Sequence, residues 1–220
     1  QLLRGFKDIL PAERPYWNFV EDTARDFASA YGFAQIGLPI LEETNLFIRS
    51  IGKQTDIVEK EMFTYVDKSE GSVTLRPEFT ASVARAYINH GMLNLPQPVN
   101  LFYWGPAFRR EKPQSGRQRQ FHQFGYEIIG DDGPIIDAKL ITMAYNLFNQ
   151  LGLRGFSIQV NSIGTPESRK IYKQELVNYY RAKRKILCED CKKRLTKNPL
   201  RLLDCKVESC QALRVEAPQI

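Results

Sequence analysis

The fold is decided by residues 119–129, which read Arg119-Gln120-Phe121-His122-Gln123-Phe124-Gly125-Tyr126-Glu127-Ile128-Ile129. Aromatic and β-branched residues dominate this stretch, which is typical of a strand. Alternate side chains of a strand share a face. One face is largely aromatic and apolar, and we expect it to lie in the core: His122, Phe124, Tyr126 and Ile128.

The other face of the same strand carries polar groups, and its members are Phe121, Gln123, Gly125 and Glu127. A carboxamide and a carboxylate beside an aromatic ring, with a glycine leaving space between them, suit the floor of a small-molecule site. A solvent-facing polar stripe is the simpler interpretation, and the alternation by itself favours it.

The rest of the chain supplies a partner for this strand and helices to cover it. Residues 99–110 form a second strand-like run, and the polar linker 111–118 is too long for a tight turn. Residues 61–66 and 72–76 predict a hairpin. We also expect short strands at 33–38 and 155–161, and helices at 12–31, 80–90, 134–151 and 165–185. Because hairpins outnumber strand-helix-strand units, the predicted class is α+β, a mostly antiparallel sheet flanked by helices.

Charged side chains gather where the long strands meet their linker. Arg109 and Arg110 end the first strand, and Arg117 and Arg119 follow in and after the linker. The planar fork of arginine suits phosphate oxygens. An exposed, solvated loop is the alternative, and it is the common outcome for a run of charges.

A carboxylate lies in the connection between the strand expected at residues 72–76 and the helix expected at residues 80–90. Glu78 is placed there to hold an ammonium group, with Thr80 two residues further on. Capping or simple electrostatics at the helix N-terminus is the alternative role, and by itself it is favoured.

Composition fits an ordinary soluble globular protein, since 43% of the 220 residues are apolar and 25% are charged. No run of 18 apolar residues predicts a transmembrane helix. The first residues show no secretory signal, so we expect a cytoplasmic protein without membrane attachment. Residues 181–206 hold ten Lys/Arg and three Asp/Glu, a net charge of +7, and the rest of the chain is close to neutral at −1, which gives the total of +6. Such a segment suits a polyanion, and a solvated helix face is equally favoured.

The cysteines fall in and just after the same basic segment, as Cys188-x2-Cys191 and Cys205-x4-Cys210. Four thiolates in two close pairs can close a tetrahedral structural zinc site. Reduced, unliganded cysteines and two disulfides are the alternatives. The expected cytoplasmic location disfavours disulfides.

In their order along the chain, these segments resemble the class II aminoacyl-tRNA synthetase core, and within it the histidyl-tRNA synthetase family. The most specific part resembles motif 2 and comprises residues 108–111 and 116–125. Residues 38–42 resemble the motif 1 dimer segment. The other matches are residues 4–11, 55–58, 60–62, 74–80, 161–164 and 198–204. The implied fold is a class II antiparallel sheet flanked by helices, with a small helical, Cys-rich insertion.

The resemblance implies activation of histidine with ATP and Mg²⁺ to histidyl-adenylate, and its attachment to tRNA(His) by a homodimer. As the catalytic residue, Arg109 would grip the ATP α-phosphate and the carboxylate region. Glu111 and Arg117 would hold the adenine end and the outer phosphates, and Phe121 would stack on adenine. The histidine α-amino group and its surroundings would be held by Glu78, Thr80, Gln123 and Glu127.

Two departures from the family stand beside these matches. Phe79 occupies a position where the family has glycine, so its ring either narrows the amino-acid pocket or packs outward. The family's histidine-recognition segments, motif 3 arginine and anticodon-binding domain lie beyond residue 220. We therefore expect residues 1–165 to be an incomplete catalytic core, residues 166–220 to be the insertion, and the chain alone to be inactive.

A non-catalytic paralogue of the same fold is the alternative function. It is the regulatory subunit of ATP phosphoribosyltransferase, which would sense histidine without charging tRNA. The intact motif 2 favours the enzyme, whereas Phe79 favours the paralogue.

Overall fold

The computed structural model describes residues 1–52, 55–162 and 164–219, and the chain divides into two compact units, Gln1–Ile158 and Gln159–Ile220. Each unit has buried clusters of its own. The domain boundary expected after residue 165 stays a prediction. Ile163, which belongs to one of the matched segments, lies outside the described residues.

Strands of the first unit form two three-stranded sheets, in the orders β1-β5-β6 and β2-β4-β3. All pairings are antiparallel except β1 with β5, which is parallel. The two hairpins predicted from the sequence are confirmed as β3–β4 and β5–β6. The strand bounds are β1 Ala34–Gln35, β2 Leu41–Glu43, β3 Phe63–Asp67, β4 Gly71–Leu75, β5 Val99–Phe108 and β6 Gln120–Ile129.

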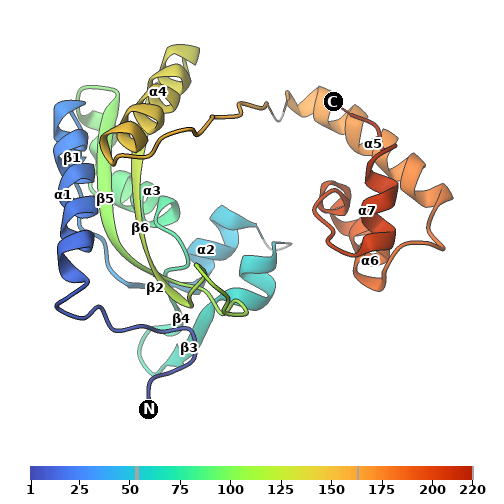
Figure 1. The fold of residues 1–220 in the computed structure, drawn as a ribbon, viewed down its shortest axis with the longest axis horizontal. Helices are drawn as coiled ribbons and strands as arrows, with labels where there is room; N and C mark the ends of the chain where they lie inside the picture. Colours follow the sequence, from blue (N-terminus) through green and yellow to red (C-terminus); the bar gives the residue numbers. More distant parts are fainter. Residues whose placement is uncertain (53–54, 163, 220) are drawn as a thin grey trace. The chain divides into compact units, whose positions relative to one another are not determined.

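Helices account for most of the remaining described chain (Figure 1). The first unit holds α1 Arg14–Ala30, α2 Thr44–Ile51, α3 Thr80–Asn89 and α4 Pro134–Gln150, with a π-helix at Ile57–Glu61 and a 3₁₀ turn at Met92–Asn94. The second unit holds α5 Pro166–Ala182, α6 Glu189–Lys197 and α7 Glu208–Arg214, with a 3₁₀ helix at Pro199–Leu202. The helices expected at 12–31, 80–90, 134–151 and 165–185 are thereby confirmed. The described residues include no helix with the length and apolarity needed to cross a bilayer.

The aromatic face of β6 packs into a cluster between the sheet and two helices. Phe124, Tyr126 and Ile128 lie against buried residues of α1 and α4, among them Phe27 and Met143. The Tyr126 hydroxyl also donates to the backbone oxygen of Ala24 in α1, at 3.1 Å. Three members of the face that alternation assigned to the core are therefore partly buried against it. The fourth, His122, lies outside this cluster and contacts the Trp17 ring, at 4.7 Å between ring centroids.

A second cluster lies on the opposite face of the same sheet and supports the site. It contains Phe79 and Val83 together with Leu101, Tyr103 and Ala107 of β5. Helix α3 is tied to the other sheet as well, because the Arg85 guanidinium pairs with both carboxylate oxygens of Glu42 in β2.

The strand expected at 155–161 is not present among the described residues, which is a correction to the sequence analysis. A strand requires a hydrogen-bonded neighbour, and the described strands pair only within the two sheets. Most of this stretch is exposed, and Val160 is 69% exposed, although Phe156 packs against the rings of Tyr145 and Phe148. Apolar composition alone therefore did not suffice to make a strand.

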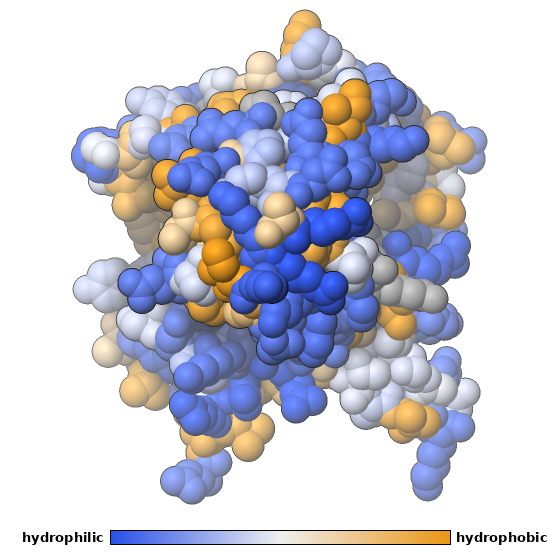
Figure 2. Space-filling model, turned by 90° about the vertical axis from the view of Figure 1, so that its right-hand side faces the viewer, coloured by the Kyte–Doolittle hydropathy of each residue, from blue (hydrophilic) through white to orange (hydrophobic). Residues whose placement is uncertain are grey.

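The second unit is a small helical body. Its first helix begins at a capping site, where the backbone N–H of Ser168 donates to Thr165 Oγ1 at 3.2 Å, and Pro166 occupies the first turn. Tyr180 and Leu176 of α5 lie fully buried against three of the four cysteines. Hydrophilic residues cover much of the surface drawn in Figure 2.

Candidate active site

The antiparallel register of β5 and β6 builds the polar floor that the sequence pattern suggested. Gln123 lies opposite Gly105, and Glu127 lies opposite Leu101. Because side chains of directly paired residues share a face, the polar members of β6 lie on the side of the Phe79 cluster.

Gly125 is required by the ring of its cross-strand neighbour. An ideal Cβ on Gly125 would lie 2.3 Å from the Tyr103 hydroxyl oxygen and 2.4 Å from Cζ. Tyr103 is 3% exposed, and its ring stacks on Phe79 at 4.3 Å between centroids. Burial, and next the charge of Glu127, raise the pKa of Tyr103 to about 12. Tyr103 thus lies under the floor as a neutral phenol.

Phe79 packs inward beneath the floor. Its ring is 1% exposed and lies between Tyr103 and the guanidinium of Arg76, whose Cζ is 3.9 Å from the ring centroid. Arg76 is itself buried and donates to the backbone oxygens of Leu38 and Pro106. The phenyl ring that departs from the family pattern therefore serves as core packing.

The carboxylates of Glu78 and Glu127 meet at the first turn of α3. Glu78 accepts the backbone N–H groups of Thr80 at 2.6 Å and Ala81 at 3.0 Å, so the capping role is present. The Thr80 hydroxyl donates to Glu127 Oε1 at 2.6 Å. Burial raises the pKa of Glu127, and the nearby Glu78 charge adds to this. Two acidic groups close together in a partly desolvated place suit a cationic ligand.

The amide oxygen of Gln123 is buried and finds no hydrogen-bond partner among the described residues. A buried acceptor left unpaired costs free energy, which native proteins usually avoid. Its position on the floor marks a place where a ligand donor would be stabilising.

A second group of predicted residues lies at the end of the same hairpin. Arg109 donates through Nε to the backbone oxygen of Pro77 at 2.9 Å, and its Cζ lies 5.1 Å from the Phe121 ring centroid. Glu111 pairs with Arg117 at 2.7 Å and approaches Arg109 Nη1 at 3.9 Å. The arginines, the carboxylate and the aromatic ring predicted for ATP are thus brought together.

Two residues of this region were missed by the sequence analysis. Glu61 lies beside Glu111, and burial, followed by the Glu111 charge, raises its pKa. Tyr103 is the other, and its position opposite Gly125 was the available signal, because a glycine facing an aromatic residue indicates a ring that crosses to the neighbouring strand. The predicted roles of the eight substrate-site residues stay predictions.

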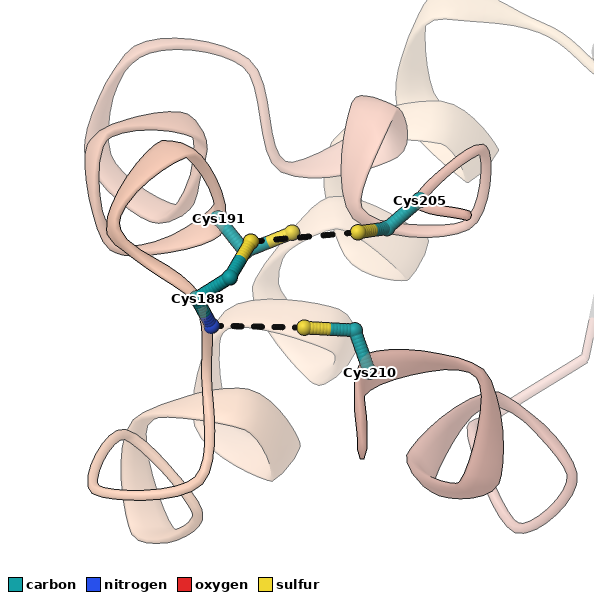
Figure 3. Close-up of side chains that lie close together, drawn as sticks. All are labelled: Cys188, Cys191, Cys205 and Cys210. Carbon is teal, nitrogen blue, oxygen red and sulfur yellow. Dashed lines mark hydrogen bonds between the residues drawn. The ribbon is translucent and has the colours of Figure 1, made fainter. Parts of the chain in front are cut away.

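The four cysteines converge in the second unit (Figure 3). Their sulfur atoms all lie within 4.8 Å of one another, and Cys188 is the least buried of the four. Cys188 Sγ lies 3.9 Å from Cys205 Sγ, and the backbone N–H of Cys188 donates to Cys210 Sγ at 3.3 Å. Each of the four is a free thiol, without a disulfide. Burial raises the pKa of Cys191 and of Cys210.

Comparison with known proteins places these features in one family. The family model described as histidyl-tRNA synthetase matches residues 5–168. Histidine–tRNA ligase of Desulforamulus reducens is 48% identical over 215 residues, and that of Geobacter sulfurreducens is 51% identical over 216. Each alignment covers 98% of this chain but only 51% and 52% of the relative, respectively. The chain spans about half the length of the curated relatives it matches.

Solved structures agree with the sequence relatives. Apo histidyl-tRNA synthetase of Staphylococcus aureus superposes with a TM-score of 0.73 at 35% identity, covering 99% of this chain and 48% of that one. An ATP phosphoribosyltransferase regulatory subunit/histidyl-tRNA synthetase from Bacillus halodurans gives 0.66 at 19% identity, covering 96% and 61%, which shows a shared fold. By its family match and its relatives, this chain belongs to the histidyl-tRNA synthetase family.

Proposed function

We propose that the protein containing this chain activates histidine with ATP and attaches it to tRNA(His). The observation that carries the proposal is the assembly of Arg109, Glu111, Arg117 and Phe121 at one end of the β5–β6 floor. The relatives named histidine–tRNA ligase support it, at about 50% identity across nearly the whole chain.

Arg109 is suited to stabilise the transition state of adenylate formation. A carboxylate oxygen of the amino acid attacks the α-phosphorus while the bond to pyrophosphate breaks, and negative charge grows on the α-phosphate oxygens. The Nε donor of Arg109 is fixed on Pro77, which holds the guanidinium in place and leaves the Nη donors for those oxygens. No protein nucleophile is required, because both reacting groups belong to substrates.

The adenine and the outer phosphates fit the remaining members of the group. Phe121 offers an aromatic face on which a base can stack. Glu111 and Arg117 hold each other in an ion pair, which fixes an acceptor for the adenine end and a cation for the phosphates. ATP is used as its Mg²⁺ complex, and the Glu61 carboxyl group would suit a divalent cation because burial and the nearby Glu111 charge raise its pKa.

The amino-acid end would lie over Gln123 and the acidic pair. An ammonium group beside Glu127 and Glu78 would offset the charge that burial disfavours. Gln123 would accept a hydrogen bond from the same ligand through its unpaired oxygen.

The histidine-sensing regulatory paralogue remains the second candidate. Its support is the similarity to the Bacillus halodurans structure, which at 19% identity shows a shared fold and nothing further. The described motif 2 residues favour the enzyme, because a sensor of histidine has no need of a phosphate-gripping arginine.

Partners and location follow from the family as further parts of the proposal. A homodimer would cover the motif 1 segment, where Ile40 and Leu41 are 43% and 42% exposed. The basic residues between 181 and 206 and the arginines of motif 2 would contact tRNA phosphates. We place the protein in the cytoplasm, where tRNA is charged.

Histidine-dependent ATP–pyrophosphate exchange by the complete gene product tests this function. Arg109→Ala removes the fixed guanidinium, so we expect exchange to fall on the order of a hundred- to a thousandfold. Arg110→Ala is the matched control, because this neighbouring arginine is exposed and is not among the residues predicted to bind ATP.

Three outcomes would contradict the proposal. Retained exchange in Arg109→Ala would refute the role of that residue. Equal losses in the two variants would attribute the effect to the local backbone. Absence of exchange in the unaltered protein, together with binding to the catalytic subunit of ATP phosphoribosyltransferase, would establish the regulatory function instead.

A further inference from the structure

The four cysteines form a compact group in the unit Gln159–Ile220, and the proposed chemistry makes no use of them. They come from separate places in the chain. Cys188 precedes α6 and Cys191 lies in its first turn, whereas Cys205 follows the 3₁₀ helix and Cys210 lies in α7. Three short segments are therefore joined at one point.

The spacing of the sulfur atoms matches a tetrahedral metal site. Four thiolates at about 2.3 Å from Zn²⁺ lie about 3.8 Å from one another. The distance from Cys188 Sγ to Cys205 Sγ is 3.9 Å, and no pair among the four exceeds 4.8 Å. Disulfide-bonded sulfurs would lie about 2 Å apart. Figure 3 shows all four side chains directed toward a common centre.

The backbone around the sulfurs is also arranged for a thiolate. The N–H of Cys188 donates to Cys210 Sγ at 3.3 Å, a bond that stabilises negative charge on sulfur. Basic residues follow the ligands closely in sequence, including Lys192, Lys193 and Lys206. They offset the net charge of about −2 that four thiolates and one Zn²⁺ carry together.

The unit has a small core that such a site would complete. Among the described residues of this unit, nine form the buried core and three of these are cysteines: Cys191, Cys205 and Cys210. A body of roughly 60 residues seldom buries enough apolar surface to be stable by itself, and a structural metal is one of the common remedies.

We propose that Cys188, Cys191, Cys205 and Cys210 bind one structural Zn²⁺ that holds α6, α7 and the intervening 3₁₀ helix together. On binding, each thiol forms a Zn–S bond and releases its proton to solvent, so no oxidant or reductant is needed. Four protein ligands fill the coordination sphere, and burial of three of them keeps water away. The site therefore stabilises structure and does no chemistry on a substrate.

The test is metal analysis of the complete gene product, purified anaerobically without chelators or added reductant and with zinc supplied. We expect about one zinc per chain. The metal-free chain titrated with Co²⁺ should develop the thiolate charge-transfer and tetrahedral d–d absorption bands, and chelation should reduce its far-UV helical signal.

Cys191→Ser should lose both the zinc and the cobalt bands. Leu195→Ala is the matched control, because Leu195 lies in the same helix and the same core but has no metal-binding atom. We expect it to lower the melting temperature while keeping full zinc content. This pair separates loss of a ligand from loss of packing.

The proposal is overturned by any of three results for the unaltered chain. The first is that the purified protein contains no zinc and, when titrated with Co²⁺, shows no cobalt absorption bands. The second is thiols that resist alkylation until reduced, which indicates disulfides. The third is iron with acid-labile sulfide, which indicates a cluster.

Discussion

At the scale of single residues, the missing side chain of Gly125 leaves the space that the Tyr103 ring occupies. Gly125→Ala would push a methyl group into the Tyr103 ring, which is held from below by Phe79. We expect destabilisation by about 1–3 kcal/mol, the usual cost of overpacking, measured by urea unfolding. Gly37→Ala is the control, since an added Cβ there meets nothing within 4 Å, and it should change stability little. Equal effects of the two substitutions would contradict the close approach.

Glu127 should make the folded chain less stable as pH rises. Burial raises its pKa above the ordinary value of 4.5, so between that value and the folded pKa the native state binds more protons than the unfolded state. Stability then falls as pH increases through this window. Glu127→Gln should be more stable than the unaltered chain at pH 7 but not at low pH, with histidine binding lost.

Denaturant unfolding at pH 7 and at low pH measures the predicted change in stability. Calorimetric titration of histidine into the complete gene product measures the predicted loss of binding. Glu70→Gln, which removes an exposed carboxylate, is the control variant. A Glu127→Gln variant whose stability followed the unaltered chain at every pH would contradict the burial effect.

Residue-level prediction succeeded where it rested on the backbone. Alternation assigned Gln123 and Glu127 to one face and Phe124 and Tyr126 to the other, because a strand imposes this on any sequence. The direction of Phe79 was left open between two alternatives. It depends on tertiary neighbours that no local pattern contains.

At the scale of elements, the pair Glu42–Arg85 joins β2 to α3 and therefore one sheet to the helix that carries Thr80. Its side chains are only 10% and 24% exposed. Glu42→Ala would leave a poorly solvated guanidinium without its partner, and we expect a loss of about 3 kcal/mol or more in unfolding free energy. Asp22→Ala breaks the exposed Asp22–Arg25 pair and should cost less than about 1 kcal/mol. Comparable losses for the two variants would contradict the importance of burial.

Element existence followed from the sequence better than sheet membership did. The long helices and both hairpins were expected, since periodicity and turn residues are local signals. The division into two sheets was not expected, because it depends on which hairpin β1 and β2 join. The prediction of a strand at 155–161 was wrong for the same reason, because the sequence of one segment does not show which strand it would pair with.

At the scale of the whole molecule, the chain should be cut first in the irregular segment that ends the first unit and begins the second, before it is cut within a helix or strand of either unit. Residues 152–162 form neither helix nor strand and are mostly exposed, and they include Arg154. Limited trypsin treatment followed by mass spectrometry should give early cleavage after Arg154. Arg154→Gln should remove that cut. Earlier cleavage within α1 or α4 would contradict the division into units.

The unpaired oxygen of Gln123 would affect how strongly the site binds amino acids other than the proposed substrate. An occupant that lacks a hydrogen-bond donor at this point would keep the acceptor dry and unsatisfied, at a cost of about 1–3 kcal/mol. This free-energy cost would weaken binding of a ligand without the donor, and no steric clash is needed. If Gln123 binds the amino acid as proposed, its unpaired oxygen would favour a ligand that places a hydrogen-bond donor there.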